Sequence, residues 1–267
     1  MPYDFHLDPE KKWRQQYLTC KNHILPFILE KVNLPPNAQI LEIGCGEGGV
    51  LKAFIERGFT CYGIDLSPSR IENARKILKE EVEKKLVAFY AFDIHDDQHF
   101  EHLFGKIDLV ILKDAIEHIH DQKKFLTALH KFIKPEGCVF LSFPPWYNPF
   151  GGHQQIAASV LRYVPWFHMT PRGLYRNILK LFGETEQRIR GLLEIYDTRL
   201  SIRKFDQILS QTNWQVRRRQ FFLVNPGYEV KFGLKPRKQI GFVGHIPELR
   251  DFISTAVYYV VSKSLKK

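Results

Sequence analysis

The sequence predicts an α/β fold: a doubly wound, mostly parallel, seven-stranded sheet with an antiparallel last strand and helices on both faces. Five short apolar runs between residues 40 and 143 have the length of buried strands, and amphipathic helical segments separate them. Strands that alternate with helices at this spacing favour parallel units. Two later strands, joined by a long connection, predict the pair that closes the sheet.

The composition is that of a globular chain with a positive charge. Its 267 residues are 44% hydrophobic and 25% charged, which allows one large domain with an insertion. The formal net charge of +10 permits an anionic partner, whether nucleic acid, phospholipid or acidic substrate, without choosing among them. Charges begin at Asp4 and no apolar run could span a bilayer, so we expect a cytoplasmic protein. The four cysteines lack C-x-x-C spacing, which predicts reduced, buried thiols.

Residues 1–38 are expected to form an N-terminal helical segment. Asp8 can cap a helix that has Pro9 in its first turn, and an apolar stripe at near-helical spacing follows. Pro26 lacks a backbone donor and is expected to interrupt this helix. The stripe consists of Trp13, Tyr17, Cys20 and Ile24.

The stretch from Ile40 to Gly49 reads ILEIGCGEGG and predicts a strand that turns tightly into a helix. Its glycines allow backbone amides to approach a ligand at the helix N-terminus. Two patterns fit these letters. One is the dinucleotide pattern G-x-G-x-x-G, with Asp65 as its later acid, and the other is E-x-G-x-G-x-G, from Glu42 to Gly48.

Polar residues follow the next strands at one edge of the predicted sheet. Asp65 ends the second strand, Asp93 follows the third and Lys113 follows the fourth. Ligands of doubly wound sheets bind outside the carboxyl ends of the strands, so we expect the binding site at this edge. The five strands are predicted at residues 40–43, 60–65, 86–92, 107–112 and 138–143.

Five segments resemble, in order, the successive motifs of class I S-adenosylmethionine-dependent methyltransferases. They are residues 40–49, YGIDLS (62–67), AFDIHD (91–96), IDLVILKDAIEHIHD (107–121) and FIKPEGCVFLSF (132–143). The resemblance implies the Rossmann-like fold of that superfamily and S-adenosyl-L-methionine as the cofactor. A dehydrogenase needs neither the acid after the third strand nor the Glu-His-Ile segment after the fourth, which favours the methyltransferase interpretation.

The resemblance also implies the cofactor site. On the family's pattern, the glycines of residues 44–48 line the methionine part, and Asp93 with Ile94 borders the adenine. Asp65 accepts from both ribose hydroxyls, which suits an ionised carboxylate because it has two acceptor oxygens. The predicted cofactor-binding residues are Glu42, Gly44, Cys45, Gly46, Gly48, Asp65, Leu66, Asp93, Ile94 and Lys113.

After the core at residues 39–145, residues 146–198 are expected to form a mobile helical lid over the substrate. The segment leaves the fifth strand at the ligand-binding edge and is rich in aromatic residues, which can wall an acceptor pocket. A helix is predicted to open at Thr170, with an apolar face and a basic face that could meet solvent or anionic headgroups. The basic face carries Arg172, Arg176 and Lys180, and the aromatic residues are Trp146, Tyr147, Phe150, Tyr163, Trp166, Phe167 and Tyr175.

His153 and His118 are the candidate catalytic residues. The methyl group of a sulfonium is already activated, so such an enzyme mainly positions the acceptor and excludes water. A base is needed only where the acceptor is a group such as a hydroxyl. His153 lies in the first loop of the lid, and His118 follows the fourth strand, where the family lines the substrate mouth.

Residues 199–267 are expected to add a helix and a β-hairpin that complete the sheet. The two strands are predicted at residues 214–224 and 255–262, with a connection interrupted by Pro and Gly between them. A C-terminal hairpin of this kind is typical of class I methyltransferases. Helix N-caps are predicted at Ser67, Asp121 and Ser201.

Neither a metal site nor a nucleic-acid motif is predicted. Five residues of metal-ligand type crowd together without the spacing of a tetrahedral site. Base N-methyltransferases would show D/N/S-P-P-Y/F/W after the fourth strand, where this chain has Lys-Asp-Ala-Ile. Phe143 to Trp146 resembles that motif but follows the fifth strand. The crowded residues are His95, Asp96, Asp97, His99 and His102.

The sequence therefore predicts S-adenosylmethionine-dependent methyl transfer to a small organic or lipid-like acceptor, at oxygen. An RNA or protein methyltransferase and a catalytically silent cofactor-binding partner subunit stay open as alternatives. The sequence does not decide the acceptor, the use of a protein base, the oligomeric state or contact with a membrane surface.

Overall fold

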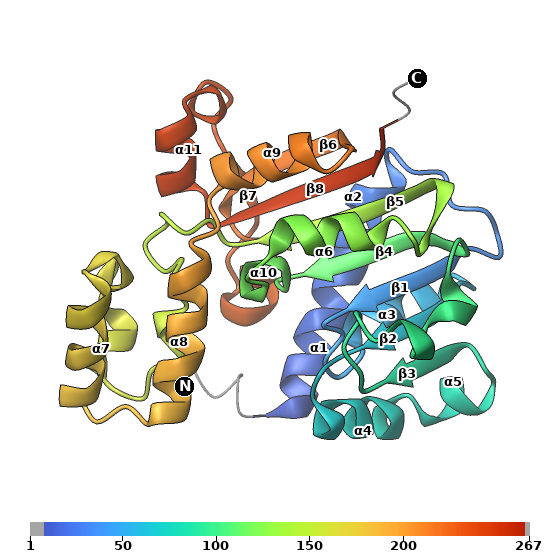
Figure 1. The fold of residues 1–267 in the computed structure, drawn as a ribbon, viewed down its shortest axis with the longest axis horizontal. Helices are drawn as coiled ribbons and strands as arrows, with labels where there is room; N and C mark the ends of the chain where they lie inside the picture. Colours follow the sequence, from blue (N-terminus) through green and yellow to red (C-terminus); the bar gives the residue numbers. More distant parts are fainter. Residues whose placement is uncertain (1–7, 265–267) are drawn as a thin grey trace.

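The computed structural model describes residues 8–264 and shows an α/β fold with one eight-stranded sheet (Figure 1). The strands are β1 (Gln39–Ile43), β2 (Thr60–Ile64), β3 (Val87–Tyr90), β4 (Ile107–Lys113), β5 (Ile133–Phe143), β6 (Trp214–Val224), β7 (Arg237–Lys238) and β8 (Ala256–Lys263). Their order is β3-β2-β1-β4-β5-β8-β6-β7. Strands β1 to β5 are parallel, whereas β8 is antiparallel to β5 and β6. The mostly parallel sheet with an antiparallel last strand is confirmed.

The predicted number of seven strands is wrong, because β7 adds an eighth at the edge of the sheet. This strand pairs antiparallel with β6 and contains only Arg237 and Lys238. Two exposed charged residues show no alternation of apolar and polar side chains, so periodicity cannot detect them.

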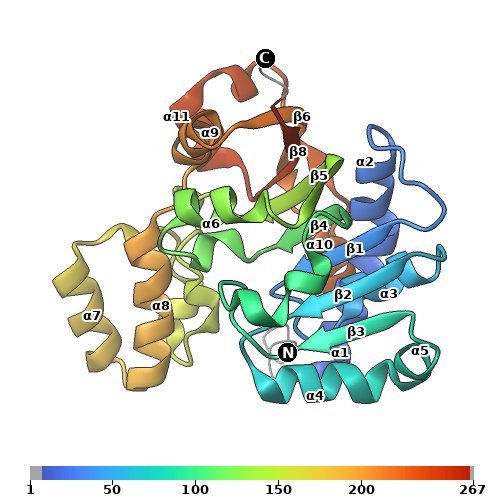
Figure 2. The same cartoon turned by 45° about the vertical axis from the view of Figure 1, so that its right-hand side comes forward.

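Helices cover both faces of the sheet (Figure 2). One core cluster packs α1 to α4 against one face, and a second packs α6 and α9 against the other. The helices are α1 (Pro9–Thr19), α2 (Leu25–Leu29), α3 (Gly49–Ile55), α4 (Pro68–Ile77), α5 (Lys79–Glu83), α6 (Gln122–Leu129), α7 (Arg172–Leu181), α8 (Glu186–Thr198), α9 (Ile202–Gln211), α10 (Gly227–Phe232) and α11 (Pro247–Ile253).

The N-terminal helix begins as predicted but does not stop at Pro26. Asp8 accepts hydrogen bonds from two backbone N–H groups of the first turn. A π-helical turn, Cys20–Ile24, then joins α1 to α2, and the Leu25 N–H donates to the carbonyl of Cys20. Because this wider turn changes the hydrogen-bond pattern directly before Pro26, the proline lies in the first turn of α2 and the helical segment continues through it.

Other local predictions are confirmed. Ser67, Asp121 and Ser201 each accept a hydrogen bond from the backbone N–H three residues further on. All four cysteines are buried and unpaired. Among residues 8–264, no helix is both long enough and apolar enough to cross a membrane.

The segment between β5 and α9 has a hydrophobic core of its own. Helices α7 and α8 pack together at one side of the molecule in both ribbon views (Figures 1 and 2). The Trp146 N–H donates to the Leu200 carbonyl at 2.9 Å, so the segment leaves and rejoins the rest of the fold at nearly one point. Its core contains Trp146, Leu161, Phe167, Tyr175, Leu179, Ile189, Leu192, Leu193, Ile195 and Tyr196.

Candidate functional site

A cavity of about 750 Å³ lies at the carboxyl ends of the parallel strands, where the sequence predicts the site. Among the predicted residues, it is lined by Gly44, Asp65, Leu66, Asp93, Ile94, Lys113, His118 and His153. The volume falls within the usual range for small-molecule sites. Donor residues and candidate bases predicted from separate parts of the sequence therefore share one cavity.

The loop between β1 and α3 forms one wall and depends on its glycines. Gly44, Gly46 and Gly48 have φ values of +76°, +54° and +80°, in the left-handed region that disfavours other residues. A Cβ at Gly44 would lie 3.2 Å from the Ala115 Cβ, so close packing adds to the conformational requirement. The backbone N–H groups of Gly44 and Cys45 both donate to the Ile64 carbonyl, which fixes the loop to the end of β2.

Asp65 holds the same loop from the end of β2. Its Oδ2 accepts from the Gly46 N–H at 2.9 Å, and its Oδ1 accepts from the Ser67 N–H at 2.9 Å. The side chain is only 7% exposed, yet it lines the cavity. Each carboxylate oxygen has a second lone pair, so Asp65 can still accept from a ligand.

Arg70 lies across the glycine loop, which the sequence does not predict. Its guanidinium is 3.1 Å from Asp65 Oδ2 and 3.3 Å from Glu47 Oε1. A Cβ at Gly46 would come within 2.2 Å of the Arg70 guanidinium. Arg70 also lines the cavity, so its flexible side chain stands where a ligand bound to Asp65 would approach.

Four predicted cofactor residues support the loop without lining the cavity: Glu42, Cys45, Gly46 and Gly48. Glu42 is 1% exposed in β1, and burial raises the pKa of its carboxyl well above the usual range. Lys113, at the end of β4, does line the cavity, and its Nζ is 2.6 Å from Asp114 Oδ2. The roles predicted for these residues toward a cofactor stay predictions.

Asp93 and Ile94 follow β3 and line the cavity beyond Asp65. Asp93 Oδ1 accepts from the His95 N–H at 2.9 Å, which shapes the turn, and Ile94 is buried. Phe92 lines the same part of the cavity and stacks on the His99 ring, with centroids 3.7 Å apart. This arrangement offers an apolar surface beside one acceptor, which suits a flat heterocycle.

The other end of the cavity holds a cluster of two histidines and a buried acid. The rings of His118 and His153 lie 5.4 Å apart in a T-shaped arrangement. His153 Nε2 is 3.8 Å from Glu117 Oε1. Glu117 is 2% exposed, and neither of its carboxyl oxygens has a hydrogen-bond partner among the described residues. Burial, with the nearby Asp114, raises the pKa of Glu117 well above its usual range.

A tight loop places His153 at this cluster. A Cβ at Gly151 would lie 2.3 Å from the Trp146 carbonyl oxygen, and one at Gly152 would lie 2.1 Å from the His168 Cβ. Both contacts involve atoms that cannot easily move. His153 itself has a φ of +57°, so the chain turns sharply as it delivers the ring to the cavity.

A family model for the methyltransferase domain matches residues 11–217. The chain belongs to this family. The identification of a class I S-adenosylmethionine-dependent methyltransferase from sequence motifs is thereby confirmed.

Curated relatives match parts of this methyltransferase domain. The ubiquinone biosynthesis O-methyltransferase of Pseudomonas aeruginosa is 33% identical over 104 residues, which are 39% of this chain and 43% of the relative. Norajmaline N-methyltransferase of Rauvolfia serpentina is 34% identical over 98 residues, which are 36% of this chain and 32% of the relative. Each match thus spans less than half the length of the relative.

Solved methyltransferases share the fold over most of the chain. Geranyl diphosphate C-methyltransferase from Streptomyces coelicolor, solved with Mg²⁺, geranyl diphosphate and S-adenosyl-L-homocysteine, has a TM-score of 0.57 at 13% identity. That match covers 89% of this chain and 77% of the solved one. A plantazolicin methyltransferase solved with S-adenosylhomocysteine has a TM-score of 0.53 at 14% identity and covers 98% and 87%. At these identities the likeness concerns the fold.

The methyltransferase cavity has two further walls, whose lining residues the sequence analysis does not name. Helix α1 contributes Lys12, Gln15 and Gln16. The connection between β6 and β8 contributes a second set of lining residues. This wall could have been predicted, because β6 runs in the same direction as β5 and both strands end at the same edge of the sheet. A connection that leaves β6 must therefore start at the site. Its lining residues are Asn225, Gly227, Tyr228, Lys231 and Thr255.

The aromatic wall predicted for the acceptor is largely wrong. Of the seven aromatic residues named from the sequence, only Phe150 lines the cavity. Trp146, Phe167 and Tyr175 instead form the core of the inserted segment, because a separate helical pair needs buried side chains of its own. Tyr147, Tyr163 and Trp166 are exposed on its surface.

The crowded residues after β3 make local contacts. Among the described residues, no group of three or more His, Cys, Asp or Glu side chains could hold an ion. His99 stacks on Phe92, and His102 Nε2 is 3.0 Å from the Tyr90 hydroxyl, so these rings serve local packing.

Proposed function

We propose that this chain transfers the methyl group of S-adenosylmethionine to an oxygen of a small organic or lipid-like acceptor. One observation carries the proposal: six of the ten residues predicted for the donor and both candidate bases line a single cavity. The names of the O-, N- and C-methyltransferases that the chain resembles, which include small-molecule biosynthetic enzymes, support the acceptor class.

The residues at the β1 and β2 end fit S-adenosylmethionine. Gly44 of the glycine loop lines the cavity, and Asp65 keeps acceptor capacity for ligand hydroxyls. Asp93 and Ile94 offer an edge for the adenine. Arg70 must share Asp65 with the ribose or move aside, which its long side chain allows. The sulfonium supplies an activated methyl group, so these residues bind and orient.

His153 is the proposed base, with Glu117 behind it. A hydroxyl acceptor must lose its proton as the methyl group arrives, and a neutral imidazole can take it. The resulting imidazolium would face the Glu117 carboxyl, 3.8 Å away and shielded from water. An ionised Glu117 would stabilise this imidazolium, and the positive charge of the imidazolium would in turn lower the raised pKa of Glu117. His118 is the alternative base from the same cluster.

Residues 146–198 are proposed as the lid over the acceptor. Asn148, Phe150, His153, Gln155 and Ile156 line the cavity from this segment, whereas its helical core lies apart. On this proposal, residues 39–145 bind the donor, residues 1–38 cover it, and residues 199–267 complete the sheet.

A transfer assay with labelled methyl donor tests the function. We expect label in small-molecule fractions of a metabolite and lipid extract, and no label in RNA or protein. With the acceptor in hand, His153→Gln is expected to lower kcat about 10²- to 10⁴-fold while S-adenosylhomocysteine affinity stays unchanged. The matched control is His120→Gln, an exposed histidine in the same region that does not line the cavity.

Two results would contradict the proposal. Label found only in RNA or protein would overturn the acceptor class. An undiminished kcat in His153→Gln would show that His153 is not the base. The variant His118→Gln would then test the alternative base.

A further inference from the structure

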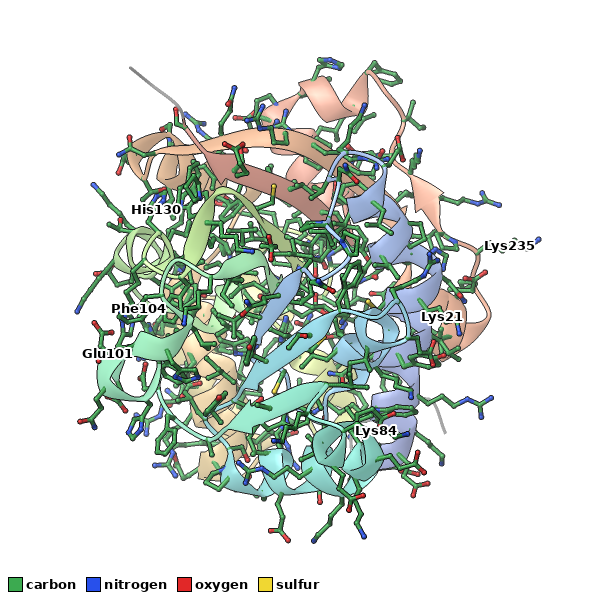
Figure 3. The ribbon with its side chains drawn as sticks, turned by 90° about the vertical axis from the view of Figure 1, so that its right-hand side faces the viewer. Lys21, Lys84, Glu101, Phe104, His130 and Lys235 are labelled. Carbon is green, nitrogen blue, oxygen red and sulfur yellow. The ribbon has the colours of Figure 1, made fainter. Side chains whose placement is uncertain are left out.

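The connection after α10 carries an exposed surface that the cavity does not use. Residues 233–247 contain no acid and include three exposed cations, Lys235, Arg237 and Lys238. None of these three forms an ion pair within residues 8–264. Figure 3 shows Lys235 projecting outward from the edge of the molecule. We call residues 235–246 the edge loop.

Large apolar side chains lie beside these cations. Ile240 is 60% exposed, Phe242 is 68% exposed and Ile246 is 43% exposed. Isolated exposed apolar residues are ordinary, but three within seven positions of one turn are a local concentration. The edge loop thus combines apolar tips with uncompensated positive charge.

The exposure follows from an ordered backbone. The carbonyl of Ile240 accepts from the N–H groups of Val243 and Gly244, and the carbonyl of Val243 accepts from the Ile246 N–H. The Gln239 N–H donates to the Phe221 carbonyl and so ties the turn to β6. Val243 is 5% exposed and anchors the turn inward. The turn therefore holds Ile240 and Phe242 outward on a fixed support.

Helix α7 provides an instructive contrast. It also exposes apolar side chains, with Leu174 at 51% and Leu181 at 81%. Its cations, however, form ion pairs with acids of α8. Arg172 pairs with Asp197, and Lys180 pairs with Glu186 at 2.7 Å. Each cation of the predicted basic face of α7 therefore has an acidic partner, whereas the three cations of the edge loop have none within the described part of the chain.

We propose that the edge loop docks this protein onto an anionic lipid surface. Its apolar tips would enter the boundary between headgroups and acyl chains, and its cations would lie at the level of the lipid phosphates. Charge complementarity selects this partner over a neutral protein surface. RNA is a less suitable partner, because single-stranded RNA is bound by several aromatic rings on which its bases stack. The edge loop has only two such rings, Phe242 and His245. The proposal does not depend on the identity of the methyl acceptor.

Vesicle sedimentation tests the proposal on the full chain. We expect binding to vesicles with about 50% phosphatidylglycerol in phosphatidylcholine, little binding to pure phosphatidylcholine, and loss of binding between about 0.1 and 0.5 M salt. The double variants Ile240→Ser with Phe242→Ser, and Arg237→Glu with Lys238→Glu, are each expected to lower the partition coefficient at least about tenfold.

A matched control separates the edge loop from exposed apolar surface in general. Leu174→Ser with Leu181→Ser removes comparable exposed side chains from α7 and is expected to change vesicle binding less than about twofold. All variants should keep the thermal unfolding midpoint and S-adenosylhomocysteine affinity of the parent, since the altered side chains are exposed and outside the cavity.

Each of four outcomes would overturn the proposal. The parent protein could fail to sediment with anionic vesicles. The edge-loop variants could bind as tightly as the parent, or the α7 control could lose binding equally. Finally, the parent could retain poly-uridine RNA while ignoring the vesicles, which would assign the edge loop to nucleic acid.

Discussion

The two ends of the cavity are built in different ways. We call the end proposed to bind the methyl donor the donor end, and the end proposed to bind the acceptor the acceptor end. At the donor end, main-chain geometry makes the site: three glycines with positive φ, two N–H groups held by one carbonyl, and Asp65 bonded to the loop that it faces. At the acceptor end, side chains converge from β4, the inserted segment and the β6–β8 connection. The donor end thus follows from the sheet itself, whereas the acceptor end depends on elements added to the sheet.

Removing the inserted segment separates the two ends most completely. Because the Trp146 N–H meets the Leu200 carbonyl, a short Gly/Ser linker can replace residues 147–199 without stretching the chain. We expect methyl transfer to be abolished and S-adenosylhomocysteine affinity to stay within a few-fold. Calorimetry and a transfer assay at saturating donor measure the two effects. If donor affinity collapses while turnover survives, the segment belongs to the donor end.

Asp65→Ala should have the next largest effect, confined to the donor end. The variant removes a charged acceptor for two hydroxyls and also frees the Gly46 N–H. We expect S-adenosylhomocysteine binding to weaken by about 2 to 4 kcal/mol. Titration calorimetry checks this value, with the exposed Asp96→Ala as control. Tight binding of NAD without any response to S-adenosylhomocysteine would refute the assignment of the donor end.

The inserted segment should show a pH dependence of its own, through His168. His168 is fully buried, its Nε2 contacts the Trp146 carbonyl at 2.7 Å, and burial lowers its pKa from 6.5 to about 4. Between pH 4 and pH 6.5 the unfolded chain binds more protons than the folded chain. The free energy of unfolding therefore decreases by about 3 kcal/mol as the pH falls from 6.5 to 4.

Comparison with His168→Gln isolates this effect. Buried Asp251 has the opposite effect on stability. Burial raises its pKa from 3.8 to about 6, so its contribution to the free energy of unfolding decreases as the pH rises from 3.8 to 6. Urea unfolding of parent and variant at several pH values should give a difference that shrinks toward pH 4. A constant difference would show that His168 does not titrate with folding.

Asp93→Ala should give the smallest effect. Asp93 is exposed, and the hydrogen bond recorded for its side chain is the one from the His95 N–H in its own turn, so the fold should be unchanged. A partly solvated hydrogen bond contributes about 0.5 to 1.5 kcal/mol, so we expect a loss of affinity for S-adenosylhomocysteine of a few-fold to about tenfold. An unchanged dissociation constant would mean that the turn after β3 does not border the adenine.

The comparison also explains which features could be predicted. Glycine spacing, strand length and acids at strand ends are local signals, so the donor end and the parallel sheet could be derived from residues 40–143. The acceptor end depends on tertiary packing. Aromatic content could not distinguish Phe150, in the cavity, from Tyr175, in a separate core. Arg70 was missed because a helical arginine carries no sign that it will fold back over a loop.

Helix α1 has a consequence for the order of catalytic events. The Trp13 carbonyl oxygen lies 2.4 Å from where a Gly49 Cβ would be, and the Tyr17 hydroxyl bonds Glu56, so α1 is fixed to α3. The cavity wall that α1 provides is therefore packed firmly against α3. The other walls come from the turns after β3 and β4, the inserted segment and the β6–β8 connection. We expect ligands to pass between these walls, and product-inhibition kinetics would show whether the methylated product leaves before S-adenosylhomocysteine.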